Sequence, residues 1–505
     1  MADLFLLGVS EIFQIDMLIV ILLGVVAGIL AGLIPGFTVT MAIVLTLPLT
    51  FGMEPIMGVA AMVAVTVGGM SGGLITAALL GIPGTPSAVA TTFDGYPMSR
   101  KGQPGKALSL GIWASFLSSI ISLVVLIAIA PQVANFALQF GPWEMFSLIV
   151  AALTIIASVT GESILKGLIA GLFGLLIATV GADPIAGITR FTFDVDVLRA
   201  GIPFLVVLIG MFAISRLMNS VERTELVSDI QQKQEDKMKS MKFVLKPKET
   251  FMSIIKKPVN LIRSSAIGSI IGAIPGAGGS IANIIAYDQA KKWSKESEKF
   301  GTGHDEGVVA SEAGNNSTVG GDLIPTIALG IPGSAVTAVL LSALMVHGIN
   351  PGPLLITNEP NIVGGIFIAF LVASFFMLIT QFLGIRLFVR VTEVPTQILF
   401  PLIMVLCVTG TFVLNNRITD IYLLFVIGII GYLFTKYKFA LAPIIIGVIL
   451  GPIAEVNLRR AFMADPDWTL FFSRPISLVF LILAVLSIAF TIWQSRRVKH
   501  RKAQG

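Results

Sequence analysis

The chain has 505 residues, of which 55% are hydrophobic and only 12% charged, and its mean hydropathy is +0.91. These values exclude a soluble multidomain protein and are typical of a polytopic membrane protein. The formal net charge of +5 does not indicate a nucleic-acid partner, because lysine and arginine gather in a few loops, as the positive-inside pattern predicts.

The first half of the chain carries two interruptions of apolar sequence. Ile34-Pro35-Gly36 follows the apolar segment 17–33, and Ile82-Pro83-Gly84 follows 55–80. Proline removes a helix hydrogen bond and glycine permits a turn, so we predict that one helix stops at each tripeptide and another restarts after it. We call these tripeptides break 1 and break 2.

Plainer apolar segments follow near 108–130, 143–159, 164–180 and 202–217. We therefore predict a first membrane repeat over residues 1–217, with its broken helices in 17–97. Residues 218–263 form the only long hydrophilic segment, where lysines mix with acids. We interpret this segment as a solvated cytoplasmic linker in preference to a lipid-binding or regulatory site.

The same two tripeptides return after the linker, as Ile274-Pro275-Gly276 (break 3) and Ile331-Pro332-Gly333 (break 4). The offsets are similar, 275 − 35 = 240 and 332 − 83 = 249. This repetition predicts a second membrane repeat over 264–452, with its broken helices in 264–353. Residues 453–505 then supply an extra C-terminal helix and a basic tail.

The charged loops predict the orientation of the two halves. The basic tail and the linker are expected in the cytoplasm, and the N-terminus, which has no basic residue before Arg100, in the periplasm. Counting the apolar segments from both ends of the chain gives the two halves opposite orientations in the membrane. The same count places Arg459 on the periplasmic side. We predict an all-α polytopic integral membrane protein with two inverted-topology repeats of broken or re-entrant helices, roughly 11–14 membrane helices in all.

A helix that restarts inside the membrane presents free N–H groups and a partial positive charge, which suit a carboxylate. Side chains just after each break add donors, although each is equally well explained as a helix cap. The predicted substrate-binding residues are Gly36, Thr38, Thr40, Gly84, Thr85, Ser87, Gly276, Gly278, Gly279, Ser280, Asn283, Gly333, Ser334 and Thr337.

The stretch from Glu312 to Leu341 is polar and rich in glycine, so we expect non-helical backbone there that lines a cavity. Its oxygen atoms suit a hard cation such as Na⁺, and its carboxylates suit a proton. For Asp322 a simple capping role is an equal alternative. The predicted cation-binding residues are Glu312, Asn315, Asn316, Ser317, Thr318 and Asp322.

The order of these motifs resembles the large membrane subunit of the tripartite tricarboxylate transporters, the TctA family. The resemblance rests on GIPGTPSAVATTFDGYPMSRKGQPGKAL from Gly81, on the break 3 region, and on GGDLIPTIALGIPGSAVTAVLLSALMVHGINPGPLL from Gly320. Four positions differ from that family's pattern. This chain has Ser71 where an aromatic residue is common, Gly81 where Asn is common, Gly314 in place of Ala and Asp322 in place of a small residue.

What the resemblance implies is a bacterial inner-membrane importer of tricarboxylates or related carboxylates, coupled to Na⁺ or H⁺, with Na⁺ favoured. Its partners would be a small membrane subunit (TctB-like) and a periplasmic solute-binding protein (TctC-like), and the broken-helix core would move in an elevator-like manner. No cofactor and no structural metal is expected. The lone cysteine, Cys407, lies in apolar sequence and is expected to be buried and unreactive.

Two other functions compete with transport. An intramembrane serine protease would use Ser71 with His347 as base, and an aspartyl protease would pair Asp288 with Asp322. A scaffold subunit that transports nothing would need no polar cavity. The chain contains neither a nucleotide-binding loop nor a zinc-protease helix motif, so ATP is not expected to drive it directly.

Overall fold

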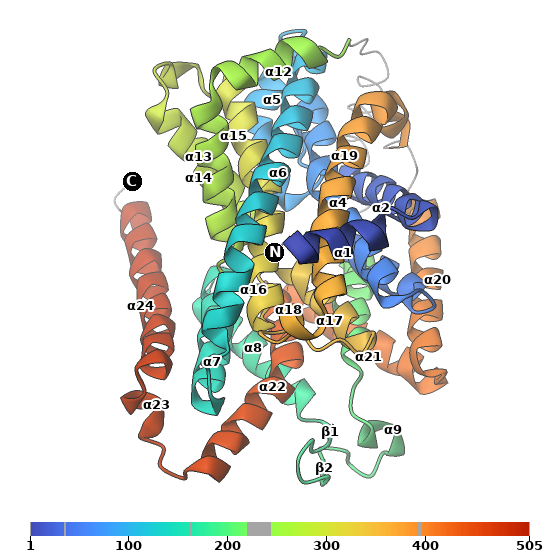
Figure 1. The fold of residues 1–505 in the computed structure, drawn as a ribbon, viewed down its shortest axis with the longest axis vertical. Coiled ribbons are helices and arrows are strands. Elements are labelled where there is room, and N and C mark those ends of the chain that lie inside the picture. The colour runs from blue at the N-terminus through green and yellow to red at the C-terminus, as the bar shows by residue number, and fades with distance from the viewer. Residues whose placement is uncertain (1, 35–36, 161–162, 220–243, 392–395, 504–505) are drawn as a thin grey trace. The chain divides into compact units, whose positions relative to one another are not determined.

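The computed structural model describes residues 2–34, 37–160, 163–219, 244–391 and 396–503. Within this range the chain is almost wholly helical (Figure 1). Eight of the described helices are long and apolar enough to cross a membrane, which confirms the predicted class of all-α polytopic membrane protein. They are α2 (Ile15–Leu33), α4 (Pro55–Leu80), α6 (Pro104–Ala137), α7 (Pro142–Val159), α19 (Pro360–Val391), α21 (Ile418–Lys436), α22 (Ala442–Ala464) and α24 (Pro475–Ala503).

The chain forms two compact units, of which unit 1 comprises Met1–Val133 and Asn219–Gly410. Unit 1 holds α2, α4, α19, most of α6 and all four breaks. Its other elements are α1 (Ala2–Ile12), α3 (Val39–Thr46), η1 (Leu47–Thr50), η2 (Pro86–Ala88), α5 (Thr91–Arg100), α12 (Pro247–Lys256), α13 (Pro258–Gly272), α14 (Gly278–Trp293), η4 (Ser297–Lys299), α15 (Asp305–Asn316), α16 (Thr318–Leu329), α17 (Ala335–Val346), α18 (Leu355–Asn358) and most of α20 (Thr396–Asn415).

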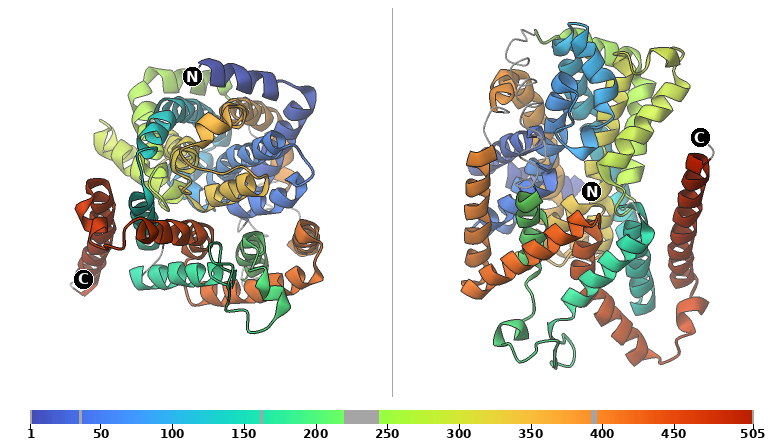
Figure 2. Two further views of the ribbon diagram at one scale, coloured as in Figure 1. Left: turned by 60° about the horizontal axis from the view of Figure 1, so that its bottom comes forward. Right: turned by 180° about the vertical axis from the view of Figure 1, so that it is seen from behind.

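Unit 2 comprises Ala134–Met218 and Thr411–Gly505. It holds α7, α21, α22 and α24, and α24 packs along α7 (Figure 2). Its other elements are α8 (Ile164–Ala178), the antiparallel pair β1 (Gly181–Ala182) and β2 (Thr189–Arg190), α9 (Asp196–Arg199), α10 (Phe204–Leu208), the π-helical η3 (Ile209–Ile214) and α23 (Leu470–Ser473). Each unit draws on sequence from before and after the linker, so the predicted halves remain a prediction from the sequence repeat.

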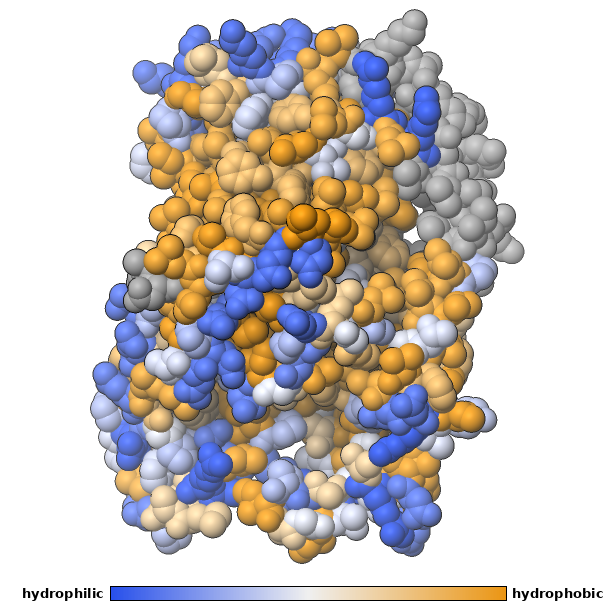
Figure 3. All heavy atoms as spheres, turned by 45° about the vertical axis from the view of Figure 1, so that its right-hand side comes forward, coloured by the Kyte–Doolittle hydropathy of each residue, from blue (hydrophilic) through white to orange (hydrophobic). Residues whose placement is uncertain are grey.

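Apolar side chains cover much of the visible surface (Figure 3). Large hydrophobic residues stand open on many helices, for example Leu383 at 82% and Val485 at 65% exposure. A water-soluble protein does not leave so much contiguous apolar surface uncovered. The surroundings that suit this surface are lipid chains.

The packing of α2 on α4 recurs in the packing of α13 on α16. A Cβ added at Gly32 would lie 2.2 Å from the carbonyl oxygen of Gly69, and one added at Gly272 would lie 2.6 Å from that of Thr318. These are matched positions, since 32 + 240 = 272 and 69 + 249 = 318. The repeat seen in the sequence is therefore also a repeat of interhelical contacts.

The second break of each repeat closes onto the first helix in the same way. A Cβ at Gly84 would lie 2.2 Å from the carbonyl oxygen of Gly32, and one at Gly333 would lie 2.9 Å from that of Gly272. The helices before these breaks, α4 and α16, both end in a left-handed glycine, with φ of 72° at Gly81 and 69° at Gly330. A side chain at Gly84 or Gly333 is excluded because the backbone of each break packs directly against the backbone of the first helix.

Two segments differ from the expectations drawn from the sequence. The stretch after Glu312 is mostly helical, because α15 and α16 follow one another through a turn at Ser317, and non-helical backbone is confined to residues 330–334. The predicted linker contains α12 and the first residues of α13, while 220–243 lie outside the described residues. Thr250 and Ile254 of α12 are buried, so this part of the linker is packed.

A charged cluster in unit 2 contains the arginine that the topology count places outside. The Arg459 guanidinium lies 2.5 Å from the Asp183 carboxylate and 2.9 Å from that of Glu455. Glu455 also pairs with Arg190 at 2.6 Å. The Asp183 carboxylate further accepts N–H groups of Ile185 and Ala186. The positive-inside rule counts arginines whether or not they have acidic partners, so these bonds show how Arg459 is held and leave the topology count unchanged.

We predict that Asp183→Asn lowers the melting temperature at neutral pH. The N–H groups of Ala186 and Ile185, with Arg459, hold the pKa of Asp183 below its ordinary value. A lowered pKa means that the stabilisation is present above the usual carboxyl pKa of about 4 and is lost as the pH falls through the folded-state value. The gap between wild type and variant in a thermal melt should therefore narrow below about pH 4. Asp194→Asn, at an exposed position, is the control; a gap independent of pH would contradict the assignment.

We also predict that Gly84→Ala and Gly333→Ala each destabilise unit 1 by about 1–3 kcal/mol or more, because the new methyl group meets backbone and neither side can move cheaply. Thermal unfolding in detergent measures this loss. Gly52→Ala is the matched control, since a Cβ there would meet nothing within 4 Å. Equal melting temperatures for all three variants would show that the close contacts do not matter.

Candidate functional site

The restart of α14 after break 3 lies against the segment that follows break 2. The Asn283 side-chain amide of α14 donates to the Ser87 carbonyl oxygen, and the Ser87 hydroxyl lies 3.0 Å from that of Thr85. A Cβ at Gly279, in the first turn of α14, would lie 2.9 Å from Cβ of Ser87. Predicted substrate residues from two breaks thus lie together, although the bonded pair Asn283 and Ser87 is 196 positions apart in sequence.

Asn315 of α15 completes this group. Its side-chain amide donates to the Met70 carbonyl oxygen on α4 at 2.8 Å, and its oxygen would be 2.8 Å from a Cβ at Gly279. Only a glycine at the start of α14 leaves room for that oxygen. The predicted cation-binding segment and the predicted substrate residues therefore meet at the N-terminus of α14. We call Thr85, Ser87, Gly279, Asn283 and Asn315 the break centre.

Break 3 and break 4 are joined directly. The Gly276 N–H donates to the Gly333 carbonyl oxygen at 2.7 Å. A Cβ added at Gly278 would lie 4.0 Å from Cβ of Ser334. Gly276 and Gly278 both have positive φ, 84° and 57°. The chain can therefore turn sharply into α14 while its backbone stays bonded to break 4.

Three of the predicted hydroxyl residues act as helix caps. Thr38 begins α3, and its Oγ1 accepts the Met41 N–H at 3.2 Å. Ser334 begins α17, where its N–H donates to Oγ1 of Thr337 at 2.9 Å and its Oγ accepts the Thr337 N–H. For these residues the cap alternative describes the observed bonds.

Of the described residues, three other predicted substrate residues, Ser280, Thr40 and Gly84, contribute less to this arrangement. Ser280 is exposed on α14, and Thr40 is buried in the first turn of α3. Gly36 lies outside the described residues. Gly84 serves close packing against Gly32, as described above.

Glu312 is fully buried and held by hydroxyl groups. Thr91 donates to its Oε1 at 2.5 Å and Ser115 to its Oε2 at 3.1 Å, and the Asn316 amide reaches Ser115 at 2.8 Å. This network ties α15 to α5 and α6. The sequence reading missed Thr91 and Ser115, since isolated hydroxyl residues in helices carry no distinctive signal.

The remaining predicted cation residues lie around the turn between α15 and α16. The hydroxyls of Ser317 and Thr318 donate to backbone carbonyls of the preceding turn, both at 2.6 Å. Asp322 is 5% exposed and takes the place that Gly73 has in the first repeat, since 73 + 249 = 322. Its Cα would lie 2.7 Å from a Cβ at Gly333 and its Oδ1 3.0 Å from a Cβ at Gly272, so Asp322 lies where break 4 meets α13.

Several buried oxygen atoms in this region have no hydrogen-bond partner among the described residues. They are Oδ1 of Asn283, Asn315, Asn316 and Asp322. A buried acceptor without a partner is costly, so such groups are expected to serve a ligand, an ion or water. Amide, carboxylate and carbonyl oxygens are the ligands that hard cations take.

Comparison with known protein families assigns the chain to one of them. Residues 18–446 match the family model described as "Tripartite tricarboxylate transporter TctA family". The chain belongs to the TctA family. It is 34% identical over 456 residues to an "Uncharacterized 52.8 kDa protein in TAR-I ttuC' 3'region" of Agrobacterium vitis, covering 90% of this chain and 88% of that one. A second protein of that organism, an "Uncharacterized protein in TAR-II ttuC' 3'region", is 34% identical over 233 residues, covering 46% and 96%. No solved structure matches.

The geometry of this TctA-family chain does not fit either protease. A Cβ at Gly58 would lie 2.8 Å from Nε2 of His347, and Ser71 is thirteen residues further along the same helix, or about 20 Å at 1.5 Å per residue. Asp288 is half exposed and paired with Lys292 at 2.6 Å, whereas Asp322 is buried at break 4. Ser71 and His347 are therefore too far apart to share a proton, and the two aspartates lie in different surroundings, one exposed and one buried.

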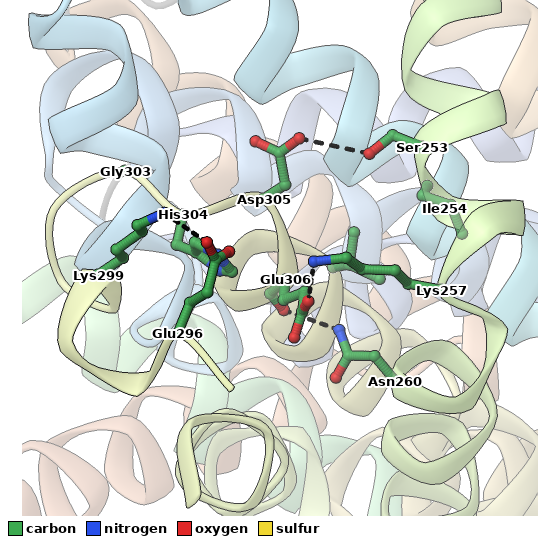
Figure 4. Close-up of a pocket in the computed structure, with 11 residues that line it drawn as sticks. Ser253, Ile254, Lys257, Asn260, Glu296, Lys299, Gly303, His304, Asp305 and Glu306 are labelled. Atoms are coloured by element: carbon green, nitrogen blue, oxygen red, sulfur yellow. Dashed lines mark hydrogen bonds and ion pairs between the residues drawn. The ribbon is translucent and has the colours of Figure 1, made fainter. Parts of the chain in front are cut away.

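A polar cavity of about 220 Å³ lies at one end of unit 1 and holds none of the predicted site residues (Figure 4). On one wall Glu296 pairs with Lys299 and His304, which lowers the pKa of Glu296 to about 2. On the other, Lys257 pairs with Glu306. These charges compensate one another, so the cavity is explained as a surface network apart from the break centre.

The sequence reading also missed Gln381 on α19. It is fully buried, and its amide donates to the Ser71 hydroxyl at 2.9 Å, while its Oε1 has no partner among the described residues. A single amide in an apolar helix is a signal that could have found it, because such residues inside membranes are costly. This bond joins α4 to α19.

We predict that Ser71→Ala costs about 1–3 kcal/mol of stability, because it leaves the buried Gln381 amide without an acceptor. The double variant Ser71→Ala/Gln381→Leu should recover most of that loss, since both polar groups are then gone. Thermal unfolding measures all three proteins. A double variant less stable than either single one would contradict the pairing, and uptake should change only modestly in Ser71→Ala, whereas a serine protease would lose all activity.

Proposed function

We propose that this chain is the substrate-translocating large subunit of a tripartite secondary importer of tricarboxylates or related organic carboxylates, coupled to Na⁺ or H⁺. The observation that carries the proposal is the convergence of breaks 2, 3 and 4 on α14, whose first turn has no side-chain cap. Membership of the TctA family supports the transport class.

The substrate carboxylate is received at the N-terminus of α14. The N–H groups of Gly278, Gly279 and Ser280 open that helix, and its dipole favours negative charge. The hydroxyls of Thr85 and Ser87, 3.0 Å apart, add neutral donors beside it. No lysine or arginine belongs to this set, so the anion is held by weak, reversible bonds that suit release as well as capture.

The coupling cation is held next to the substrate by oxygen atoms of the second repeat. The unpartnered Oδ1 atoms of Asn315 and Asn316 come from the helix that faces α14, and Asp322 adds a carboxylate at break 4. Na⁺ takes several such oxygens at once, whereas a proton would need only Asp322 or Glu312. The amide oxygens support Na⁺.

The proposed partners are a TctB-like small membrane subunit and a TctC-like periplasmic solute-binding protein, in the bacterial inner membrane. The linker and the C-terminus are placed in the cytoplasm and the N-terminus in the periplasm, as the lysine and arginine distribution predicts. Family membership is what supports this arrangement.

The test is uptake of radiolabelled di- and tricarboxylates into proteoliposomes that hold this chain and its small subunit, with the loaded binding protein outside. We predict that uptake requires an inward Na⁺ gradient and falls at least tenfold, about 1.4 kcal/mol, in Asn315→Ala/Asn316→Ala. Lys291→Ala, at an exposed position on the same helix as Asn283, is the matched control.

Two results would contradict the proposal. If no carboxylate enters with either a Na⁺ or a proton gradient, although the binding protein is loaded, the chain does not import carboxylates and a scaffold function must be considered. If uptake proceeds but the double variant behaves as Lys291→Ala does, the cation site lies elsewhere.

A further inference from the structure

Helix α12 carries exposed apolar residues within a lysine-rich segment. Met252 is 47% and Ile255 49% exposed, while Lys248 and Lys256 flank them on the same short helix. No described residue forms an ion pair with either lysine. A helix in water would not expose this apolar pair without a partner, and lysine at both ends is typical of helices at a membrane surface.

Exposed apolar residues continue into the next helix, α13. Val259, Ile262 and Ile270 of α13 are 70%, 56% and 65% exposed and follow Met252 and Ile255 at intervals of three, four and eight residues. Within each helix such spacing places the residues along one side, and the non-helical residue Lys257 separates the two helices. We call these five residues, two on α12 and three on α13, the apolar stripe.

The start of α12 is fastened to the beginning of the spanning helix α6. The Trp113 indole N–H donates to the Pro247 carbonyl oxygen at 3.0 Å, its ring lies 4.6 Å from that of Phe251, and the Lys246 N–H donates to the Ser109 hydroxyl at 3.0 Å. Figure 1 shows α12 lying across this end of unit 1, whereas α6 runs along it. Helix α12 is therefore held where α6 leaves the membrane.

Charge indicates which membrane surface this is. Arg100, Lys101 and Lys106 lie immediately before or within the first turn of α6, which places this end in the cytoplasm. The cytoplasmic leaflet carries anionic headgroups that attract lysines close to a spanning helix. The tryptophan at the same level is typical of the membrane interface.

We propose that α12 lies in the headgroup layer of the cytoplasmic leaflet, with the apolar stripe against acyl chains and Lys248 and Lys256 on the phosphates of anionic lipids. This revises the interpretation of the whole segment 218–263 as a solvated linker. The inference is independent of the proposed transport function, because it rests on α12, α13 and α6 alone.

The experiment measures the depth of position 252 in reconstituted full-length protein. Met252→Cys is labelled with an environment-sensitive fluorophore, which Cys407 does not take up because it is 1% exposed. The vesicles contain either phosphatidylcholine alone or phosphatidylcholine with phosphatidylglycerol, and a trace lipid bears a quencher at its headgroup. Glu298→Cys, exposed in the η4 turn of the same unit, is the aqueous control.

We expect the label at position 252 to emit at shorter wavelength and to be quenched several-fold more than that at position 298, and more strongly with phosphatidylglycerol. Lys248→Gln/Lys256→Gln should remove the effect of phosphatidylglycerol, whereas Lys291→Gln/Lys295→Gln on exposed lysines should preserve it. Equal quenching at 252 and 298 would overturn the proposal, and so would a shielded label that the lipid quencher cannot reach, which would mean that protein covers the stripe. An unchanged phosphatidylglycerol effect in Lys248→Gln/Lys256→Gln would overturn the assignment of the lysines.

Discussion

The structure of unit 1 depends on backbone packed directly against backbone inside an apolar environment. Gly32 meets the Gly69 carbonyl, Gly272 meets the Thr318 carbonyl, and in each repeat a glycine of the following break meets the first helix again. Such contacts let helices end and restart without leaving peptide groups open to lipid, which a bilayer does not tolerate. The polar residues of the breaks are held in place by this packing and by few side-chain bonds.

The two repeats use this frame differently. In the first repeat Gly73 leaves space beside Thr85, whereas the matched Asp322 brings a carboxylate to break 4. The buried Glu312 network likewise belongs to the second repeat and reaches across to Thr91 and Ser115 of the first. A symmetric scaffold thus carries an asymmetric distribution of charge.

Polar residues in this chain therefore fall into two physical classes. Ser317, Thr318 and Ser334 satisfy backbone groups of their own helix ends, so their bonds are complete. The amide nitrogens of Asn283 and Asn315 donate to neighbouring backbone, and their Oδ1 atoms have no partner among the residues that the structure describes. The second class is what distinguishes a candidate site from a set of caps, because an unused buried acceptor is stabilised only when something binds it.

The sequence by itself determined the membrane class, the four breaks and the repeat, because hydropathy, proline and glycine act locally and their effects can be read along the chain. It also placed Asn283 and Asn315 among the candidates. Only the tertiary structure decided that Ser87, Asn283 and Asn315 lie together, that Thr38 and Ser334 are caps, and that Thr91, Ser115 and Gln381 matter. These depend on pairings between residues far apart in sequence. Helix α12 is a further case. Its lysines predict a solvated linker from the sequence, whereas the tertiary contacts of α12 with α6 determine which of its faces is packed and which is open.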